Sequence, residues 1–144
     1  MREHMGLYRG KRIDNGEWVE GSLLKVSLNG KTAYLIFGDN FSFVGNDVKA
    51  LSHALVDPDT VGECTGLKDK NGKLIFEGYI CRNTKTGEVV SVHWHGTMAG
   101  FVWSKRKEKS HIFDFGEMFR AHDKYEVIGN VVDNPELLKG GEGE

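Results

Sequence analysis

Hydrophobic and polar residues alternate along much of the first forty positions, which is the pattern of half-buried β-strands. Strands are predicted over residues 7–13, 17–26 and 32–37. The connections Asp14-Asn15-Gly16 and Leu28-Asn29-Gly30-Lys31 are typical of hairpin turns, because Asn and Gly adopt positive φ at little cost. We therefore expect residues 1–55 to form an N-terminal β-hairpin and meander region.

The pattern weakens between residues 38 and 54, where the stretch 46–51 is compatible with either a helical turn or a loop. Asp57-Pro58 then predicts a turn, since proline fixes φ and holds the preceding residue extended. A boundary near residues 56–62 would separate the meander from a C-terminal barrel region, residues 56–138. At 144 residues the default is nevertheless one compact unit.

The second half is again β-like. One strand is predicted over residues 74–82 with a bend at Glu77-Gly78, followed by a pair of strands at 87–95 and 100–104 and a last strand at 125–132. Asp114 and Glu117 have capping-box spacing, which predicts one short helix. Residues 139–144 have nothing to bury and are predicted to be a disordered tail. Nineteen glycines against two prolines suit short strands joined by tight turns, so the predicted class is mainly β with minor α.

The formal net charge of −2 gives the molecule no general attraction for nucleic acid or anionic membranes, so such contacts would need a local patch. The longest apolar run, residues 33–37, is far below the roughly 20 residues of a membrane helix, and residues 1–5 lack an apolar signal core. We expect no membrane contact and a cytoplasmic location. In that reducing compartment Cys64 and Cys81 are predicted to be free thiols.

A basic loop is predicted where Lys105, Arg106, Lys107 and Lys109 gather beside Trp103. Cations next to an aromatic ring can hold a phosphate backbone and stack on a base, so this loop is a candidate nucleic-acid site. The commoner interpretation of such a run is a solvated hairpin loop.

His93 and His95 flank Trp94 in a predicted strand, so both imidazoles lie on one face, as in half of a metal site. No other His or Cys has the spacing to complete the ligand set. The favoured interpretation is two polar residues on the solvent face with Trp94 in the core, and no cofactor is predicted.

Catalysis is not indicated. The carboxylates near predicted turns, Asp57, Asp59, Glu63 and Asp69, are explained by turn capping. No nucleophile, base and orienting group can be assembled, and neither glycine-rich phosphate-binding motif is present. We therefore expect a protein without enzymatic activity, whose tryptophans pack in the core rather than line a ligand groove.

Residues 60–78, Thr-Val-Gly-Glu-Cys-Thr-Gly-Leu-Lys-Asp-Lys-Asn-Gly-Lys-Leu-Ile-Phe-Glu-Gly, resemble the hallmark of the YopX family of phage and prophage proteins. The resemblance continues through residues 89–94 and 100–101, in the segment 125–138, and in the opening residues 8–12 and 16–21. Two departures are visible: Tyr79 stands where the family usually has Asp, and Glu63-Cys64 replaces the usual Gln followed by Tyr or Phe.

The resemblance implies a small phage-encoded β protein in the cytoplasm of a bacterial host, with an SH3-like barrel in its C-terminal part. It implies no activity, because the family lacks an assigned biochemical role. The leading hypothesis is a non-enzymatic interaction module that forms a homo-oligomer or binds a phage or host protein through exposed strand edges. The alternative is a nucleic-acid-binding regulatory protein that uses the basic residues 105–109.

Overall fold

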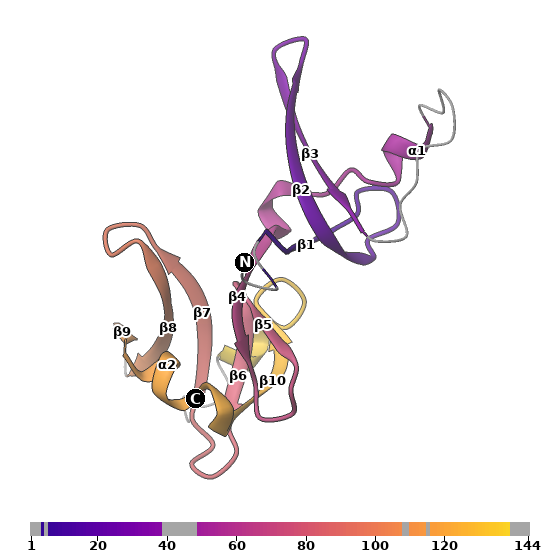
Figure 1. Cartoon of the computed structure of the whole chain (residues 1–144). Coiled ribbons are helices and arrows are strands. Elements are labelled where there is room, and N and C mark those ends of the chain that lie inside the picture. Colours follow the sequence, from indigo (N-terminus) through magenta and orange to yellow (C-terminus); the bar gives the residue numbers. More distant parts are fainter. Residues whose placement is uncertain (1–3, 5, 39–48, 108–109, 115, 139–144) are drawn as a thin grey trace. The chain divides into compact units, whose positions relative to one another are not determined.

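The computed structural model describes residues 4, 6–38, 49–107, 110–114 and 116–138 (Figure 1). The chain divides into two compact units, Met1–Cys64 and Thr65–Glu144. The division lies inside one strand, β4 (Gly62–Lys68), and the boundary expected from the sequence lay near residues 56–62. The predicted tail, residues 139–144, and most of the weakly patterned stretch fall outside the described residues.

The first unit is the predicted meander. Its strands are β1 (Tyr8–Lys11), β2 (Trp18–Leu28) and β3 (Lys31–Phe37), and the first part of β4 completes the order β3-β2-β1-β4 with antiparallel pairing. Asn29 and Gly30 both have positive φ, 52° and 76°, which is why this dipeptide makes the tight β2–β3 turn. Two short helices follow β3: α1 (Lys49–Ser52) and η1 (Pro58–Thr60).

The chain after α1 returns to cover part of the outer edge of β3. The Ile36 N–H donates to the Ala54 carbonyl at 2.9 Å, and the Val56 N–H donates to the Tyr34 carbonyl at 3.0 Å. Ile36, Ala54 and Val56 are buried. A Cβ at Gly10 would lie 3.1 Å from Ile36 Cδ1 and 3.4 Å from Val56 Cβ, so glycine lets β1 pack closely against these two side chains.

The second unit contains the second antiparallel sheet, of order β10-β6-β7-β8-β9. Its strands are β6 (Tyr79–Asn83), β7 (Val89–His95), β8 (Gly100–Lys107), β9 (Ser110–Asp114) and β10 (Tyr125–Asn130). The short β5 (Leu74–Phe76), α2 (Glu117–Ala121), η2 (His122–Lys124) and η3 (Pro135–Leu138) complete the unit. The largest buried side chains are Trp103, Tyr125, Phe76, Ile75, Ile80 and Met118.

The turn between β4 and β5 is fixed to β10 by Asp69. This buried carboxylate accepts the backbone N–H groups of Asn71 at 2.8 Å and Lys73 at 2.9 Å on one oxygen, and that of Val127 at 2.9 Å on the other. The Lys70 N–H donates to the Tyr125 carbonyl at 2.8 Å. The expectation that Asp69 serves a turn is consistent with these bonds, which also satisfy part of the outer edge of β10.

Two local predictions were wrong. The single strand expected over residues 74–82 is two strands, β5 and β6, which belong to different sheets. Gly78 makes the corner with φ of 89°, and its N–H donates to the Val92 carbonyl at 2.8 Å. The short helix exists as α2, but its N-cap is Gly116 without a side-chain cap bond, because Asp114 is still in β9.

The mainly β class is confirmed by the two antiparallel sheets. Their strand orders do not describe a closed barrel, so the SH3-like barrel stays a prediction. Cys64 and Cys81 are both buried, and neither forms a disulfide. Across the part of the chain that the structure describes, no helix has the length and apolar character needed to span a membrane.

Candidate functional site

The predicted basic loop is largely a strand. Residues 105–107 end β8 and pair with β9 in the register Lys105↔Ile112, Arg106↔His111 and Lys107↔Ser110. The prediction of a loop was therefore wrong for these three residues, because they continue the pairing of β8 with β9. Lys109 lies outside the described residues, and nucleic-acid binding by this run stays a prediction.

Lys105 has a structural partner. Its Nζ lies 3.2 Å from Glu88 Oε1, which also accepts the Tyr125 hydroxyl at 2.6 Å. The Tyr125 ring packs against buried Trp103 with 4.4 Å between centroids. Glu88 thus connects the Lys105 side chain to the aromatic core, and binding of a phosphate by Lys105 would compete with this ion pair.

His93 and His95 point to the same face of β7, as predicted, but each makes a local contact. His93 Nε2 lies 2.7 Å from the Ser91 hydroxyl, and His95 Nδ1 accepts the Met98 N–H at 3.3 Å, closing the β7–β8 turn. No cluster of three or more His, Cys, Asp or Glu residues suitable for a metal occurs within residues 4, 6–38, 49–107, 110–114 and 116–138. The metal site therefore gains no support.

The expectation that Trp94 lies in the core was wrong. Trp94 is 49% exposed and packs edge-on against its cross-strand partner Phe101, with 5.2 Å between centroids. The reason is that β7 is buried on both faces at residues 90–92, so alternation alone does not tell which face stays covered toward the strand end.

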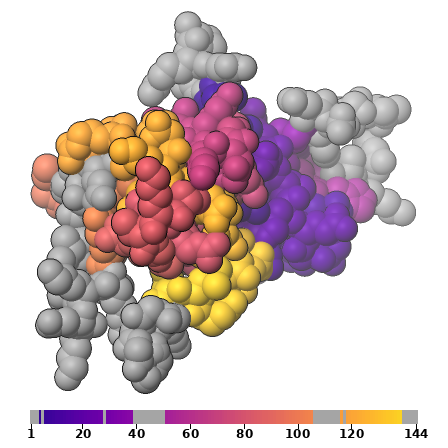
Figure 2. All heavy atoms as spheres, turned by 90° about the horizontal axis from the view of Figure 1, so that it is seen from below, coloured from indigo at the N-terminus to yellow at the C-terminus, as the bar shows by residue number. Residues whose placement is uncertain are grey.

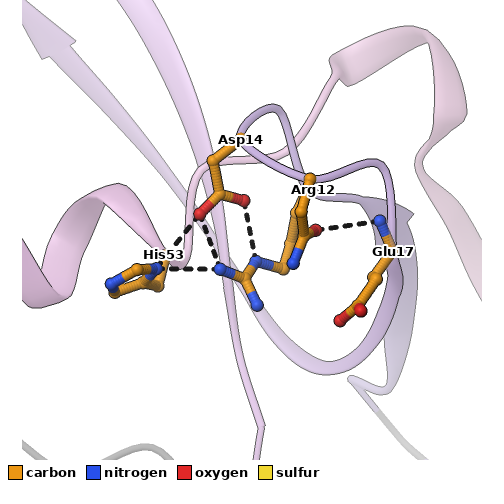
Figure 3. Close-up of polar contacts among 5 residues, drawn as sticks. Arg12, Asp14, Glu17 and His53 are labelled. Atoms are coloured by element: carbon orange, nitrogen blue, oxygen red, sulfur yellow. Dashed lines mark hydrogen bonds and ion pairs between the residues drawn. The ribbon is translucent and has the colours of Figure 1, made fainter.

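Arg12, Asp14 and His53 form a polar cluster in the first unit (Figure 3). Arg12 binds Asp14 through two hydrogen bonds, Nε to Oδ1 at 2.9 Å and Nη2 to Oδ2 at 2.6 Å. His53 Nδ1 lies 2.8 Å from Arg12 Nη2 and 3.1 Å from Asp14 Oδ2. With the ring hydrogen on Nε2, Nδ1 accepts from Arg12, and with a hydrogen on Nδ1 it donates to Asp14 Oδ2.

Arg12 and Asp14 form an ion pair, and each shifts the pKa of the other. The hydrogen bond from Arg12 lowers the pKa of Asp14, and the same bond raises the pKa of Arg12. Both groups therefore stay charged over the ordinary pH range and neutralise each other. We interpret the cluster as a brace between the β1–β2 turn and the segment that follows α1.

An apolar face on the β2–β3 hairpin was not predicted. The antiparallel partners Ser22↔Phe37, Leu24↔Leu35 and Val26↔Ala33 alternate with the pairs that carry Lys25 and Ser27, so they project to one side. We call Leu24, Val26, Ala33, Leu35 and Phe37 the Leu24 face. Leu24 is 47% exposed, although Leu35 is buried.

The sequence held a signal for this face. The Asn29-Gly30 turn fixes the register of the hairpin, and with that register positions 24, 26, 33, 35 and 37 fall on one side. The opposite side carries Lys25 over the Tyr34 ring, with Nζ 5.9 Å from the centroid, and the pair Ser27↔Thr32. This side also carries the pair Leu23↔Ile36 at the base of the hairpin, where Ile36 is buried, so it is polar only toward the β2–β3 turn.

Comparison with known proteins decides the family. The model of the family described as YopX protein matches residues 7–139. The chain belongs to the YopX family. Among solved structures, protein EF1440 from Enterococcus faecalis is similar to this YopX chain at 22% identity and a TM-score of 0.48, over 91% of this chain and 96% of that chain. No curated protein matches.

Tyr79 of this YopX protein, where the resemblance in sequence leads us to expect Asp, lies in the core. Tyr79 is buried and packs on Phe76 with 5.6 Å between ring centroids, and Lys73 Nζ lies 5.6 Å from the Tyr79 centroid. A carboxylate at this position would lie beside an aromatic core, with the Lys73 ammonium as a nearby cation. In this chain the aromatic ring adds packing directly after the Gly78 corner.

Proposed function

We propose that this chain is a non-enzymatic interaction module, encoded by a phage or prophage as an accessory protein, that self-associates through the Leu24 face. The observation that carries the proposal is the exposure of Leu24 at 47% in the middle of an apolar row on a two-stranded hairpin. The pairing of β2 with β1 ends at Gly21, so the part of the hairpin that carries Leu24 has no strand on the far side of β2, and a two-stranded ribbon gains stability when its apolar side is covered.

A second copy of the chain is the occupant that we favour. An apolar row along a hairpin is complementary to itself when two copies meet about a two-fold axis, since each Leu24 can pack against the row of the other copy. The first unit has seven Lys and Arg against nine Asp and Glu, so its charge offers little opposition to association.

We favour packing of the Leu24 faces of two copies over the addition of a partner's strand to the edge of β3. The Ala54 carbonyl and the Val56 N–H already bond to the inner half of β3. Lys31 stands at the other end of the strand, and a charged residue there discourages edge-to-edge pairing.

Size-exclusion chromatography with light scattering across a range of protein concentrations tests the proposal. The unaltered protein is expected to form a dimer. Leu24→Glu should weaken the dimer by about a hundredfold or more, because a buried Leu contributes about 1.5–3 kcal/mol and each dimer contains two.

Ser27→Glu is the matched control. It adds the same charge to the same strand on the polar side of the hairpin, and the dimer should persist. A monomer at every concentration of the unaltered protein would overturn the proposal, and so would an equal effect of the two substitutions.

A further inference from the structure

Four exposed lysines from three distant segments meet at one end of the second unit. Lys68 ends β4, Lys70 lies in the turn that follows, Lys85 in the β6–β7 turn, and Lys124 in η2 before β10. We call these four residues the lysine end. Figure 1 draws the two turns and the orange segment before β10 at the same end of this unit, and Figure 2, seen from below, shows these segments next to one another.

Hydrogen bonds fix the three segments together. The Lys70 N–H donates to the Tyr125 carbonyl at 2.8 Å, and Lys70 Nζ donates to Thr84 Oγ1 at 3.4 Å. The Thr84 N–H in turn donates to the Lys124 carbonyl at 3.3 Å. Backbone bonds thus hold the three segments on a common support, and the Lys70 ammonium contacts a neutral hydroxyl, which leaves its positive charge in place.

His122 extends this support. Its Nδ1 lies 2.6 Å from the Lys68 carbonyl oxygen, and because a carbonyl can only accept, Nδ1 carries the hydrogen. This bond ties η2 to the end of β4 across 54 positions of sequence.

Negative charge is scarce among these segments. Asp69 is buried, and both of its oxygens accept backbone N–H groups. Asp123 is the exposed carboxylate within residues 68–70, 83–86 and 122–124, against the four lysines. The lysine end is therefore locally positive, although the second unit has twelve Lys and Arg and twelve Asp and Glu.

We propose that the lysine end binds the phosphate backbone of double-stranded nucleic acid. Ammonium groups act as point charges toward phosphate oxygens, and several of them on a rigid support can contact consecutive phosphates. The residues at 68–70, 83–86 and 122–124 include no Phe, Tyr or Trp, so the stacking platform typical of single-strand binding is missing from these segments. The expected binding is insensitive to base sequence.

Fluorescence anisotropy of a labelled duplex DNA of random sequence tests this site, with a duplex RNA and a single strand as further ligands. Four phosphate contacts predict affinity that falls by about a hundredfold between roughly 50 and 200 mM salt. Replacing Lys68, Lys70, Lys85 and Lys124 by Ser should abolish this salt-dependent binding. The same four changes to Arg should preserve it, which separates lost charge from lost folding.

Controls distinguish this site from general charge effects. The double variant Lys85→Ser/Lys124→Ser should reduce the slope of log affinity against log salt by about 2. The pair Lys25→Ser/Lys31→Ser removes the same charge from exposed positions in the first unit and should change nothing. Arg106→Ser/Lys107→Ser/Lys109→Ser leaves the Lys105 ion pair intact and tests the basic run predicted from the sequence.

Three outcomes would overturn the proposal. The first is undiminished duplex binding by the folded variant with four Ser replacements, and the second is equal loss in the first-unit control. The third is binding of polyglutamate as tightly as duplex, which would indicate an acidic protein as the partner. Dimer formation is measured separately, so this site can fail or stand independently of the Leu24 face.

Discussion

The Oδ2 atom of Asp69 accepts the backbone N–H of Val127 at 2.9 Å, which ties the β4–β5 turn to the edge of β10. Asp69→Asn keeps one acceptor oxygen but places an amide N–H₂ group against a donor. When the amide oxygen keeps the bonds from the Asn71 and Lys73 N–H groups, the amide N–H₂ faces the Val127 N–H, which then has no acceptor. We expect the free energy of unfolding to fall by about 2 kcal/mol, the cost of an unsatisfied group of this kind. Urea denaturation followed by tryptophan fluorescence measures the change.

Asp123→Asn is the control for the Asp69 variant. It makes the same chemical change at an exposed position near the same turn, and the free energy of unfolding should stay within about 0.5 kcal/mol of the unaltered protein. If Asp69→Asn and Asp123→Asn had the same free energy of unfolding, the hydrogen bonds of Asp69 would contribute no more to stability than water bound in their place.

Local turn chemistry made much of the fold predictable. The Asn29-Gly30 turn and the strands around it follow from residues that adopt positive φ between alternating segments. The corner at Gly78 was anticipated as a bend, but a bend within one strand and a change of sheet have the same local pattern. Only the pairing of distant strands separates these two possibilities.

The candidate sites were less predictable for the same reason. Lys105 belongs to a conspicuous charged run, yet its partner Glu88 is supplied by a different strand connection. Lys70, Lys85 and Lys124 lie far apart in the sequence and belong to no charged run. They come together in the fold through the hydrogen bonds of Thr84 and Tyr125, which the sequence does not show. Charge runs are local in sequence, whereas this basic surface is assembled by tertiary pairing.

Tyr79 provides a second test of packing. Tyr79→Asp introduces the acid that the family resemblance leads us to expect at this position, but it removes a buried ring from Phe76 and places a carboxylate in its position. Loss of the ring contacts and burial of a charge should lower the free energy of unfolding by about 3 kcal/mol or more. Thermal unfolding followed by circular dichroism, converted to free energy, gives the comparison.

Tyr79→Phe is the matched control, because it keeps the ring and should cost about 1 kcal/mol or less. If the Asp variant were as stable as the Phe variant, Lys73 would have to compensate the acid by forming an ion pair. A double variant with Lys73→Met would then lose that stability.

Cys81 gives a prediction about alkaline pH. Burial raises the pKa of its thiol from 9.0 to about 12, the charge of Asp69 adds to the rise, and Lys73 opposes it. Because the folded-state pKa is raised, the contribution to stability is complete below pH 9 and is lost between pH 9 and about 12, as the unfolded chain releases the proton first. The loss attributable to Cys81 should approach about 1.4 kcal/mol per pH unit. Cys81→Ala should show a flatter pH dependence by urea denaturation over this window, and parallel curves for the two proteins would contradict the assignment.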